Sequence, residues 1–275
     1  MKSVMTAEKP SAFTVIGAAG FVGRHLVDYL QARGHVVNAL DRTTQGTPTG
    51  PLGHVIDCGG LTADFRSRRD EIFEAHVSRI DRLLAAASFD SYLYLSSTRI
   101  YKNSRDTSED ASLEVRPAVF DDSYNISKIA GESVCLIREG PTVRVARLSN
   151  VLGPNPDPAV FLTALIAGAK TGHLRLQESL DSSKDYVAIE DVCRYLMLIA
   201  LQGQERLYNL AYGENRTHRQ ILDCLGLHLS FTFEAPEQPT RAFPPVDNHR
   251  LVSEFGPPLV APEEAIAAIL ARRTE

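Results

Sequence analysis

Short apolar runs and amphipathic stretches alternate along this chain. Residues 13–16 form an apolar run that predicts a buried strand, and Val22, Leu26 and Leu30 follow it at helical spacing. Gly34 is well suited to end that helix. The same pattern predicts further strands at residues 35–41, 54–60, 91–97 and 142–149, and helices around residues 71–87 and 122–138. Strands that alternate with helices in this way predict an α/β fold whose parallel sheet is covered on both faces.

A second lobe is expected after Asn150, where proline residues become frequent. Residues 184–201 have the pattern of a strand and a helix that return to the first lobe. The tail is rich in loops until a closing helix at residues 262–273. We therefore expect a larger lobe and a smaller C-terminal lobe, formed by residues 1–150 with 184–203 and by residues 151–183 with 204–275.

The composition of the chain mainly argues against certain partners: nucleic acid, membranes and metal ions. The 275 residues carry a net charge of −5 and no block of lysine and arginine, which argues against a nucleic-acid partner. The start of the chain lacks the pattern of a signal peptide, and no stretch approaches the roughly 18 apolar residues of a membrane span. The four cysteines are scattered without metal-ligand spacing. We expect a cytoplasmic protein that binds no metal, membrane or nucleic acid.

Three glycines, Gly17, Gly20 and Gly23, form a G-x-x-G-x-x-G motif between the first predicted strand and the first helix. Glycine there permits a tight turn, lets backbone amides approach a pyrophosphate, and allows the helix to pack closely on the strand. The helix N-terminus, with Phe21 and Val22, adds a partial positive charge. A purely structural turn is the alternative. The position of the motif favours a dinucleotide site in the larger lobe, on a Rossmann-type, doubly wound parallel sheet.

Asp41 closes the second predicted strand, about 20 residues after the glycine motif, where a carboxylate binds the adenosine ribose in such sheets. A carboxylate at this position favours NAD, because it repels the additional phosphate of NADP. Arg42 keeps NADP open as an alternative, since its guanidinium could pair with that phosphate. Asp41 could also simply cap a turn at the strand end.

Tyr124 and Lys128 lie four residues apart in a predicted helix, so their side chains share one face. A tyrosine with its ordinary pKa of about 10 is a poor acid or base at neutral pH. A lysine ammonium close by, together with a positive nicotinamide, would lower that pKa and let the phenol exchange a proton with a substrate alcohol. Ser97 ends a strand upstream and could hold the substrate oxygen near Tyr124, with Ser96 and Thr98 as rivals.

The chain resembles the extended short-chain dehydrogenase/reductase superfamily in the order of its motifs. These are the glycine motif, "LSSTRIY", Y-x-x-x-K and "RLSNVLGP". Within this superfamily, the chain is most similar to the NAD-dependent epimerase/dehydratase family, which includes UDP-galactose 4-epimerase and the sugar-nucleotide dehydratases and reductases. The segments "KDYVAIEDV" and "LYNLAYGE" match the same pattern, and the similarity extends to about Glu214. The resemblance implies a Rossmann-type domain, a bound nicotinamide dinucleotide and a sugar substrate, often linked to a nucleotide.

The resemblance also implies roles for individual residues. Ser97, Tyr124 and Lys128 would form the catalytic triad, with Ser97 chosen because it stands four residues before Tyr101. Asn150 would contact the substrate. Together with the residue-level reasoning, the resemblance predicts two sets of binding residues. They are cofactor-binding residues (Gly17, Gly20, Phe21, Val22, Gly23, Asp41, Arg42, Gly59 and Lys128) and substrate-binding residues (Thr98, Asn150, Lys184 and Arg241).

Three of the substrate assignments have alternatives. Lys184 falls where related enzymes often have an arginine that contacts phosphate, but it could be a surface lysine. Asn150 could be an ordinary loop asparagine. The tail lacks a clear phosphate motif, and Arg241 and Arg250 are both candidates for that contact.

The chain departs from the family pattern in three places. Only about a dozen residues separate Asp41 from the strand at residues 54–60, so we expect the sheet to lack or shorten an edge strand. Asp57 stands in a segment that is alanine-rich in relatives, and its role could be structural or catalytic. Thr98 and Arg99 occupy the positions of the acidic pair by which sugar dehydratases eliminate water. Arg99 could contact an anionic substrate group or form an ion pair at the edge of the sheet.

These patterns together predict an NAD(P)-dependent epimerase or oxidoreductase that acts on a sugar, in particular a nucleotide-linked one. The alternatives are an NAD(P)H-dependent ketone reductase of sugar or natural-product biosynthesis and a non-catalytic dinucleotide sensor. Sensors typically lack the tyrosine–lysine pair, which disfavours that alternative. The helices at residues 71–87 and 122–138 carry enough apolar positions to pair across a twofold axis, as family members often do, so we expect a homodimer.

Overall fold

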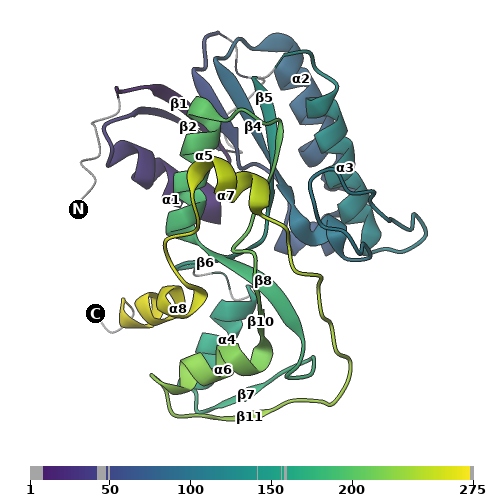
Figure 1. Cartoon of the computed structure of the whole chain (residues 1–275), viewed down its shortest axis with the longest axis vertical. Helices are drawn as coiled ribbons and strands as arrows, with labels where there is room; N and C mark the ends of the chain where they lie inside the picture. Colours follow the sequence, from purple (N-terminus) through teal and green to yellow (C-terminus); the bar gives the residue numbers. More distant parts are fainter. Residues whose placement is uncertain are drawn as a thin grey trace.

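A computed structural model describes residues 9–41, 48, 50–140, 142–155, 157 and 160–272. Its larger part is a sheet of six parallel strands in the order β2-β1-β3-β4-β5-β9, which confirms the predicted fold class (Figure 1). The strands are β1 (Ala12–Ile16), β2 (Val36–Leu40), β3 (His54–Asp57), β4 (Ser91–Ser97), β5 (Val143–Leu148) and β9 (Leu207–Leu210).

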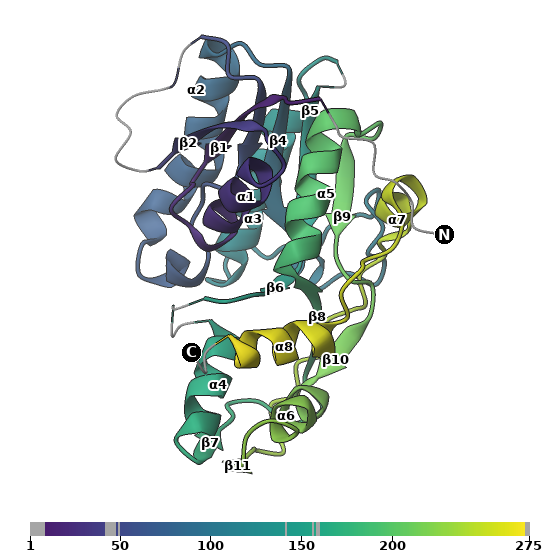
Figure 2. The same cartoon turned by 90° about the vertical axis from the view of Figure 1, so that its left-hand side faces the viewer.

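Helices cover both faces of this sheet, as the apolar strands require (Figure 2). Helices α1 (Phe21–Gln31) and α5 (Ile189–Gln202) bury their apolar sides with the strands in one core. Helices α2 (Arg79–Ala86) and α3 (Asp122–Leu136) pack on the opposite face. A further short helix, α7 (His249–Phe255), packs beside β9 at the edge.

The segment predicted as one helix at residues 71–87 is less regular than expected. Two 3₁₀ turns, Ala63–Arg66 and Arg69–Glu71, are followed by a π-helical turn at Glu74–Ser78 and only then by α2. A π turn inserts an extra residue into the helix and re-aims its side chains. Here it turns His76 inward, where the side chain is fully buried.

The smaller part of the structure, in the lower half of Figure 1, has a core of its own. Strands β6 (Asn150–Leu152), β8 (Ser183–Ala188) and β10 (Asn215–Thr217) form one small sheet, and β7 (His173–Arg175) pairs with β11 (Thr232–Glu234). Apolar side chains from helices α4 (Phe161–Lys170), α6 (His218–Gly226) and α8 (Pro262–Ala271) pack in this core.

The borders of the large sheet bear on two expectations. Strand β2 pairs only with β1 among the described residues and is an edge strand, as expected if a further strand is missing. Strand β9 belongs to the large sheet although its sequence lies within residues 204–275, and β8 pairs in the small sheet while α5 returns to the large one. The division into two lobes by residue number stays a prediction.

None of the described helices is long and apolar enough to cross a membrane. The described residues also contain no group of three or more histidine, cysteine, aspartate or glutamate side chains that could hold a metal ion.

Candidate active site

The glycine motif forms the turn between β1 and α1, and its geometry requires glycine. Gly17 has a φ of 76°, and a Cβ there would lie 2.8 Å from the amide nitrogen of Gly59. A Cβ on Gly23 would lie 2.1 Å from the carbonyl oxygen of Gly17. Gly20 closes the turn with a hydrogen bond of 2.9 Å from its amide to the same oxygen. Side chains at Gly17 and Gly23 would therefore push the turn away from the helix and from the loop after β3.

The N-terminus of α1 is well suited to bind a phosphate group. Gly20 is its N-cap, and among the described residues no side chain caps the helix and no acidic residue lies in its first turn. The first amides of the helix, which include those of Phe21 and Val22, therefore keep their partial positive charge available for a ligand. The residues present here fit the pyrophosphate of a dinucleotide.

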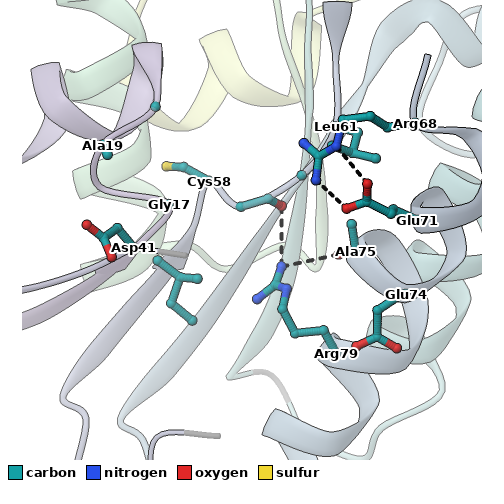
Figure 3. Close-up of a pocket in the computed structure, with 14 residues that line it drawn as sticks. Gly17, Ala19, Asp41, Cys58, Leu61, Arg68, Glu71, Glu74, Ala75 and Arg79 are labelled. Atoms are coloured by element: carbon teal, nitrogen blue, oxygen red, sulfur yellow. Dashed lines mark hydrogen bonds and ion pairs between the residues drawn. The ribbon is translucent and has the colours of Figure 1, made fainter. Parts of the chain in front are cut away.

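A cavity of about 640 Å³ opens beside the glycine turn (Figure 3). Asp41 and Arg79 approach it from opposite sides, and Gly17 and Cys58 lie between them. Gly59 also lines the cavity, while Arg42 lies outside the described residues. This cavity therefore brings together the glycine turn, the ribose-binding candidate Asp41 and the loop that follows β3.

Asp57 at the end of β3 is completely buried and receives three hydrogen bonds. Its donors are Arg79 Nη2 at 2.9 Å, the Gly59 amide at 2.9 Å and the Tyr92 hydroxyl at 2.5 Å. The ion pair with Arg79 compensates the cost of burying the carboxylate, and Asp57 raises the pKa of Arg79 against the lowering effect of burial. Asp57 thus holds in place the loop after β3, which lines the 640 Å³ cavity, called the cofactor cavity below.

A second cavity, of about 400 Å³, brings the predicted catalytic residues together. Ser97 at the end of β4 lines it with Tyr124 and Lys128 of α3, and Phe21 and Val22 of α1 face the same space. Gly20 and Cys58 line both this cavity and the first one. The two cavities therefore meet at the glycine turn, as an extended dinucleotide would require.

Lys128 is held inside the protein beside the Tyr124 ring. Its ammonium donates a hydrogen bond of 2.9 Å to the carbonyl oxygen of Leu95 and lies 6.0 Å from the centre of the Tyr124 ring. Burial lowers the pKa of Lys128 from 10.5 to about 8, although the charge of Asp57 acts to raise it. A lysine with this pKa still carries its charge at neutral pH.

The pKa of Tyr124 moves in the direction opposite to the sequence-based expectation. Burial raises it, while the Ser97 hydroxyl and the positive charge of Arg99 act to lower it. Removal of the phenol from water is the dominant effect in the protein alone. The expectation that Lys128 lowers this pKa included a positively charged nicotinamide in the same cavity, which would favour the phenolate further.

Sequence reasoning did not single out His76. This residue links the loop after β3 to α3, the helix that carries Tyr124 and Lys128. Its Nε2 accepts a hydrogen bond of 3.0 Å from the Leu61 amide, so Nδ1 carries the proton and donates to the Ser127 hydroxyl at 2.9 Å. That hydroxyl in turn donates to the carbonyl oxygen of Tyr124 at 2.8 Å. Burial and the nearby Lys128 charge lower the pKa of His76 to about 2, so the ring stays neutral.

Two smaller cavities contain substrate-binding candidates. One of about 170 Å³ is lined by Ser97, Thr98, Asn150 and Lys184. The side-chain amide of Asn150 donates a hydrogen bond of 2.9 Å to the carbonyl oxygen of Asp185. The other, of about 350 Å³, begins at Lys184 and extends into the smaller lobe.

The larger of these two cavities has aromatic and charged walls. Phe161 and His218 stack with ring centres 4.8 Å apart, and the Lys184 ammonium lies 5.4 Å from the Phe161 ring. Glu178 also lines this cavity, and Arg241 forms an ion pair of 3.2 Å with it. Arg241 therefore lies next to a residue of the cavity wall.

The sequence left two arrangements open for Arg99, a contact with an anionic substrate group or an ion pair within the protein. In the structure Arg99 forms an ion pair. Its guanidinium lies 3.3 Å from the Asp121 carboxylate and contacts the rings of Phe65 and Tyr124, at 5.2 and 5.6 Å from their centres. Neither Thr98 nor Arg99 can serve as the carboxylic acid that assists loss of water.

Comparisons with known proteins identify the family of the chain. The profile of the family described as "NAD dependent epimerase/dehydratase family" matches residues 13–75 and 51–211. The chain is 28% identical to GDP-6-deoxy-D-mannose reductase of Pseudomonas aeruginosa over 254 residues, which cover 82% of this chain and 83% of that one. It is 28% identical to UDP-glucose 4-epimerase of Mycolicibacterium smegmatis over 255 residues, or 75% and 79% of the two chains. A solved structure of MoeE5 with UDP-glucose and NAD matches with a TM-score of 0.78 and 23% identity, over 96% of this chain and 99% of that one.

Proposed function

This chain belongs to the NAD dependent epimerase/dehydratase family, and we propose that it epimerises or reduces a nucleotide-linked sugar with Tyr124 as the proton-transferring residue. The observation that carries the proposal is the convergence of Ser97, Tyr124 and Lys128 on one cavity, next to the glycine turn. That cavity and the 170 Å³ cavity share Ser97 and Asn150, so a substrate held by the smaller lobe can present a hydroxyl group to Tyr124.

When bound, the nicotinamide supplies the acceptor or donor of a hydride. In the oxidative direction, Tyr124 as phenolate removes the proton from the substrate hydroxyl while the hydrogen on the same carbon leaves with its electron pair. Ser97 holds the substrate oxygen by a hydrogen bond, and the charge of Lys128 stabilises the phenolate. In the reductive direction, Tyr124 as phenol returns its proton to the oxygen of the ketone.

Epimerisation and ketone reduction are favoured over dehydration. Loss of water needs an acid near the leaving hydroxyl, and the positions after Ser97 hold Thr98 and the ion-paired Arg99. Reduction is the second candidate, because one of the similar proteins is a reductase of a GDP-linked sugar. The presence of Tyr124 and Lys128 in one cavity argues against a sensor without catalytic activity.

The 350 Å³ cavity supports binding of the nucleotide part of the substrate. Stacked Phe161 and His218 offer flat surfaces for a base, and Lys184 offers a positive charge for a phosphate. For the cofactor we propose NAD rather than NADP, because Asp41 lines the cavity that takes the adenosine half.

We also propose that two copies form a dimer through the face that carries α2 and α3. These helices pack side by side, and the nearby Phe73 and Ile137 side chains are 47% and 75% exposed. Sedimentation velocity of the purified protein tests this: a dimer supports the proposal, and a monomer at micromolar concentration contradicts it.

The proposed reaction is tested with a panel of UDP-, GDP- and dTDP-linked hexoses and their keto derivatives, each with NAD, NADH or NADPH. An epimerase converts one sugar into its epimer with no net change in the absorbance of reduced nicotinamide. A reductase consumes one equivalent of reduced cofactor for each ketone. Equal rates for wild type and Tyr124→Phe on the substrate so identified would contradict the assigned role of Tyr124.

A further inference from the structure

Arg79 is a charged residue of the cofactor cavity to which the sequence pattern gives no role. It is the first residue of α2, and its side chain is 29% exposed and lines the 640 Å³ cavity. Its hydrogen bonds to the described residues all come from one terminal nitrogen, Nη2, which donates to Asp57, to the Gly59 carbonyl and to the Ala75 carbonyl. Figure 3 shows the other terminal nitrogen on the side that faces Asp41.

The order of groups along the cavity indicates what this guanidinium meets. The pyrophosphate is expected at the N-terminus of α1 and the adenosine ribose at Asp41. The part of the cavity opposite Asp41, toward Arg79, is then left for the adenine ring. The wall of this part comprises the apolar groups of Leu61 and Ala75 and the guanidinium of Arg79. A second guanidinium in the wall, that of Arg68, is ion-paired with Glu71.

The environment of Arg79 favours a neutral aromatic ligand over a further phosphate. Asp57 lies 2.9 Å from Nη2 and is completely buried, so the guanidinium is already paired with a negative charge. Asp41 and Glu74 add carboxylates to the cavity wall. A paired guanidinium keeps its flat face and its remaining N–H groups, which match the π-face and the nitrogen acceptors of a purine.

We propose that Arg79, held by Asp57, binds the adenine ring of the dinucleotide and is a determinant of cofactor affinity. The proposal rests on dinucleotide binding by this family, and it assigns to Asp57 the role of a positioning residue. It explains why an aspartate ends β3: the carboxylate fixes the guanidinium beside the loop at Gly59.

Calorimetric titration with NAD, AMP and nicotinamide mononucleotide tests the proposal by separating the two halves of the cofactor. We expect Arg79→Met to weaken binding of NAD and AMP at least tenfold and to leave binding of nicotinamide mononucleotide within twofold of wild type. NADP should lose affinity by the same factor as NAD, because the adenine ring is common to both. The matched control is Arg116→Met, which removes an arginine that pairs with the buried Asp122 at 3.5 Å and lies outside the cavity.

Arg79→Met leaves the Asp57 carboxylate buried without its ion-pair partner and could prevent folding. The double variant Asp57→Asn with Arg79→Met contains no such unpaired charge and is measured in parallel, with thermal unfolding as the check on folding. Folded variants that bind AMP and NAD as wild type does would overturn the role of Arg79 and leave the proposed function intact. Failure of wild type to bind NAD or NADP would instead refute dinucleotide binding itself.

Discussion

The ammonium of Lys128 donates a 2.9 Å hydrogen bond to the carbonyl oxygen of Leu95. This bond ties the catalytic helix α3 to strand β4, two residues before Ser97. The positions of Ser97, Tyr124 and Lys128 relative to one another therefore depend on the packing of one helix on one strand. Since Lys128 is only 3% exposed, its charge depends on neighbouring groups, above all on Asp57.

The burial of Lys128 predicts a specific pH dependence of stability. Its pKa falls from 10.5 to about 8 in the folded protein, so between these values the unfolded chain binds more protons at this residue. The free energy of unfolding of wild type should therefore rise relative to Lys128→Met as the pH increases from 8 to 10.5. The full shift of the Lys128 pKa corresponds to a change of about 3 kcal/mol in the free energy of unfolding. Urea denaturation of both proteins across this range measures the difference, and a difference that does not change with pH would contradict the lowered pKa.

Tyr124→Phe should reduce kcat on the identified substrate by about 10² to 10⁴, because it removes the group that exchanges the substrate proton. Binding of NAD should change little, since the phenyl ring keeps the apolar contacts of Tyr124 with Phe65, whose ring centre lies 5.0 Å away. Steady-state rates and calorimetric titration give the two quantities. A parallel loss of NAD affinity would indicate that Tyr124 serves cofactor binding instead.

His76→Gln should remove an acid sensitivity that wild type has. The pKa of His76 is lowered from 6.5 to about 2, so below pH 6.5 the unfolded chain takes up a proton that the folded protein does not. Between pH 7.5 and pH 5, the free energy of unfolding of wild type should fall by about 2 kcal/mol relative to that of His76→Gln. Glutamine can still accept from Leu61, which limits the effect at pH 7.5. Denaturation at both values measures this, and equal acid sensitivity would show that His76 is protonated in the fold.

Gly23→Ala should severely destabilise the glycine turn, because its Cβ would lie 2.1 Å from the Gly17 carbonyl oxygen. We expect a loss of several kcal/mol or of measurable NAD binding. Gly226→Ala is the matched control: it ends α6, and no atom lies within 4 Å of the added Cβ. Thermal unfolding and NAD titration compare the two, and a Gly23→Ala protein as stable as the control would contradict the close contact between α1 and the turn.

Asp41→Ser should shift the cofactor preference toward NADP. Serine keeps a hydrogen-bonding group at the ribose but removes the carboxylate that repels a 2′-phosphate. We expect the ratio of NADP to NAD dissociation constants to fall at least tenfold, as measured by calorimetry. An unchanged ratio would show that Asp41 does not face the ribose.

The local features of the site could be predicted from sequence, because they depend on residues close together in the chain. The turn at Gly17, Gly20 and Gly23 follows from conformational and packing limits that only glycine meets. The shared face of Tyr124 and Lys128 follows from helical spacing. The resemblance to a known family added Ser97, and the structure places it beside the other two in one cavity.

The contacts between distant segments could not be predicted in this way. Arg79 pairs with Asp57 across 22 positions, and His76 reaches Ser127 across 51. The signal for Arg79 was present in Asp57 itself, since a carboxylate at the end of a buried strand requires a partner. The inward direction of His76 depends on a π turn that no spacing in the sequence indicates. The raised pKa of Tyr124 likewise reflects burial, which becomes known only once the cavity is defined.

The central claim is that this protein binds a nicotinamide dinucleotide and a nucleotide-linked sugar in adjoining cavities. Calorimetric titration of cofactor-free protein with NAD and NADP, repeated with UDP-, GDP- and dTDP-linked sugars, tests it most directly. We expect tight NAD binding, and an affinity for one sugar nucleotide that improves when NAD is present. Absence of binding by both dinucleotides would contradict the claim and leave the glycine turn as a purely structural feature.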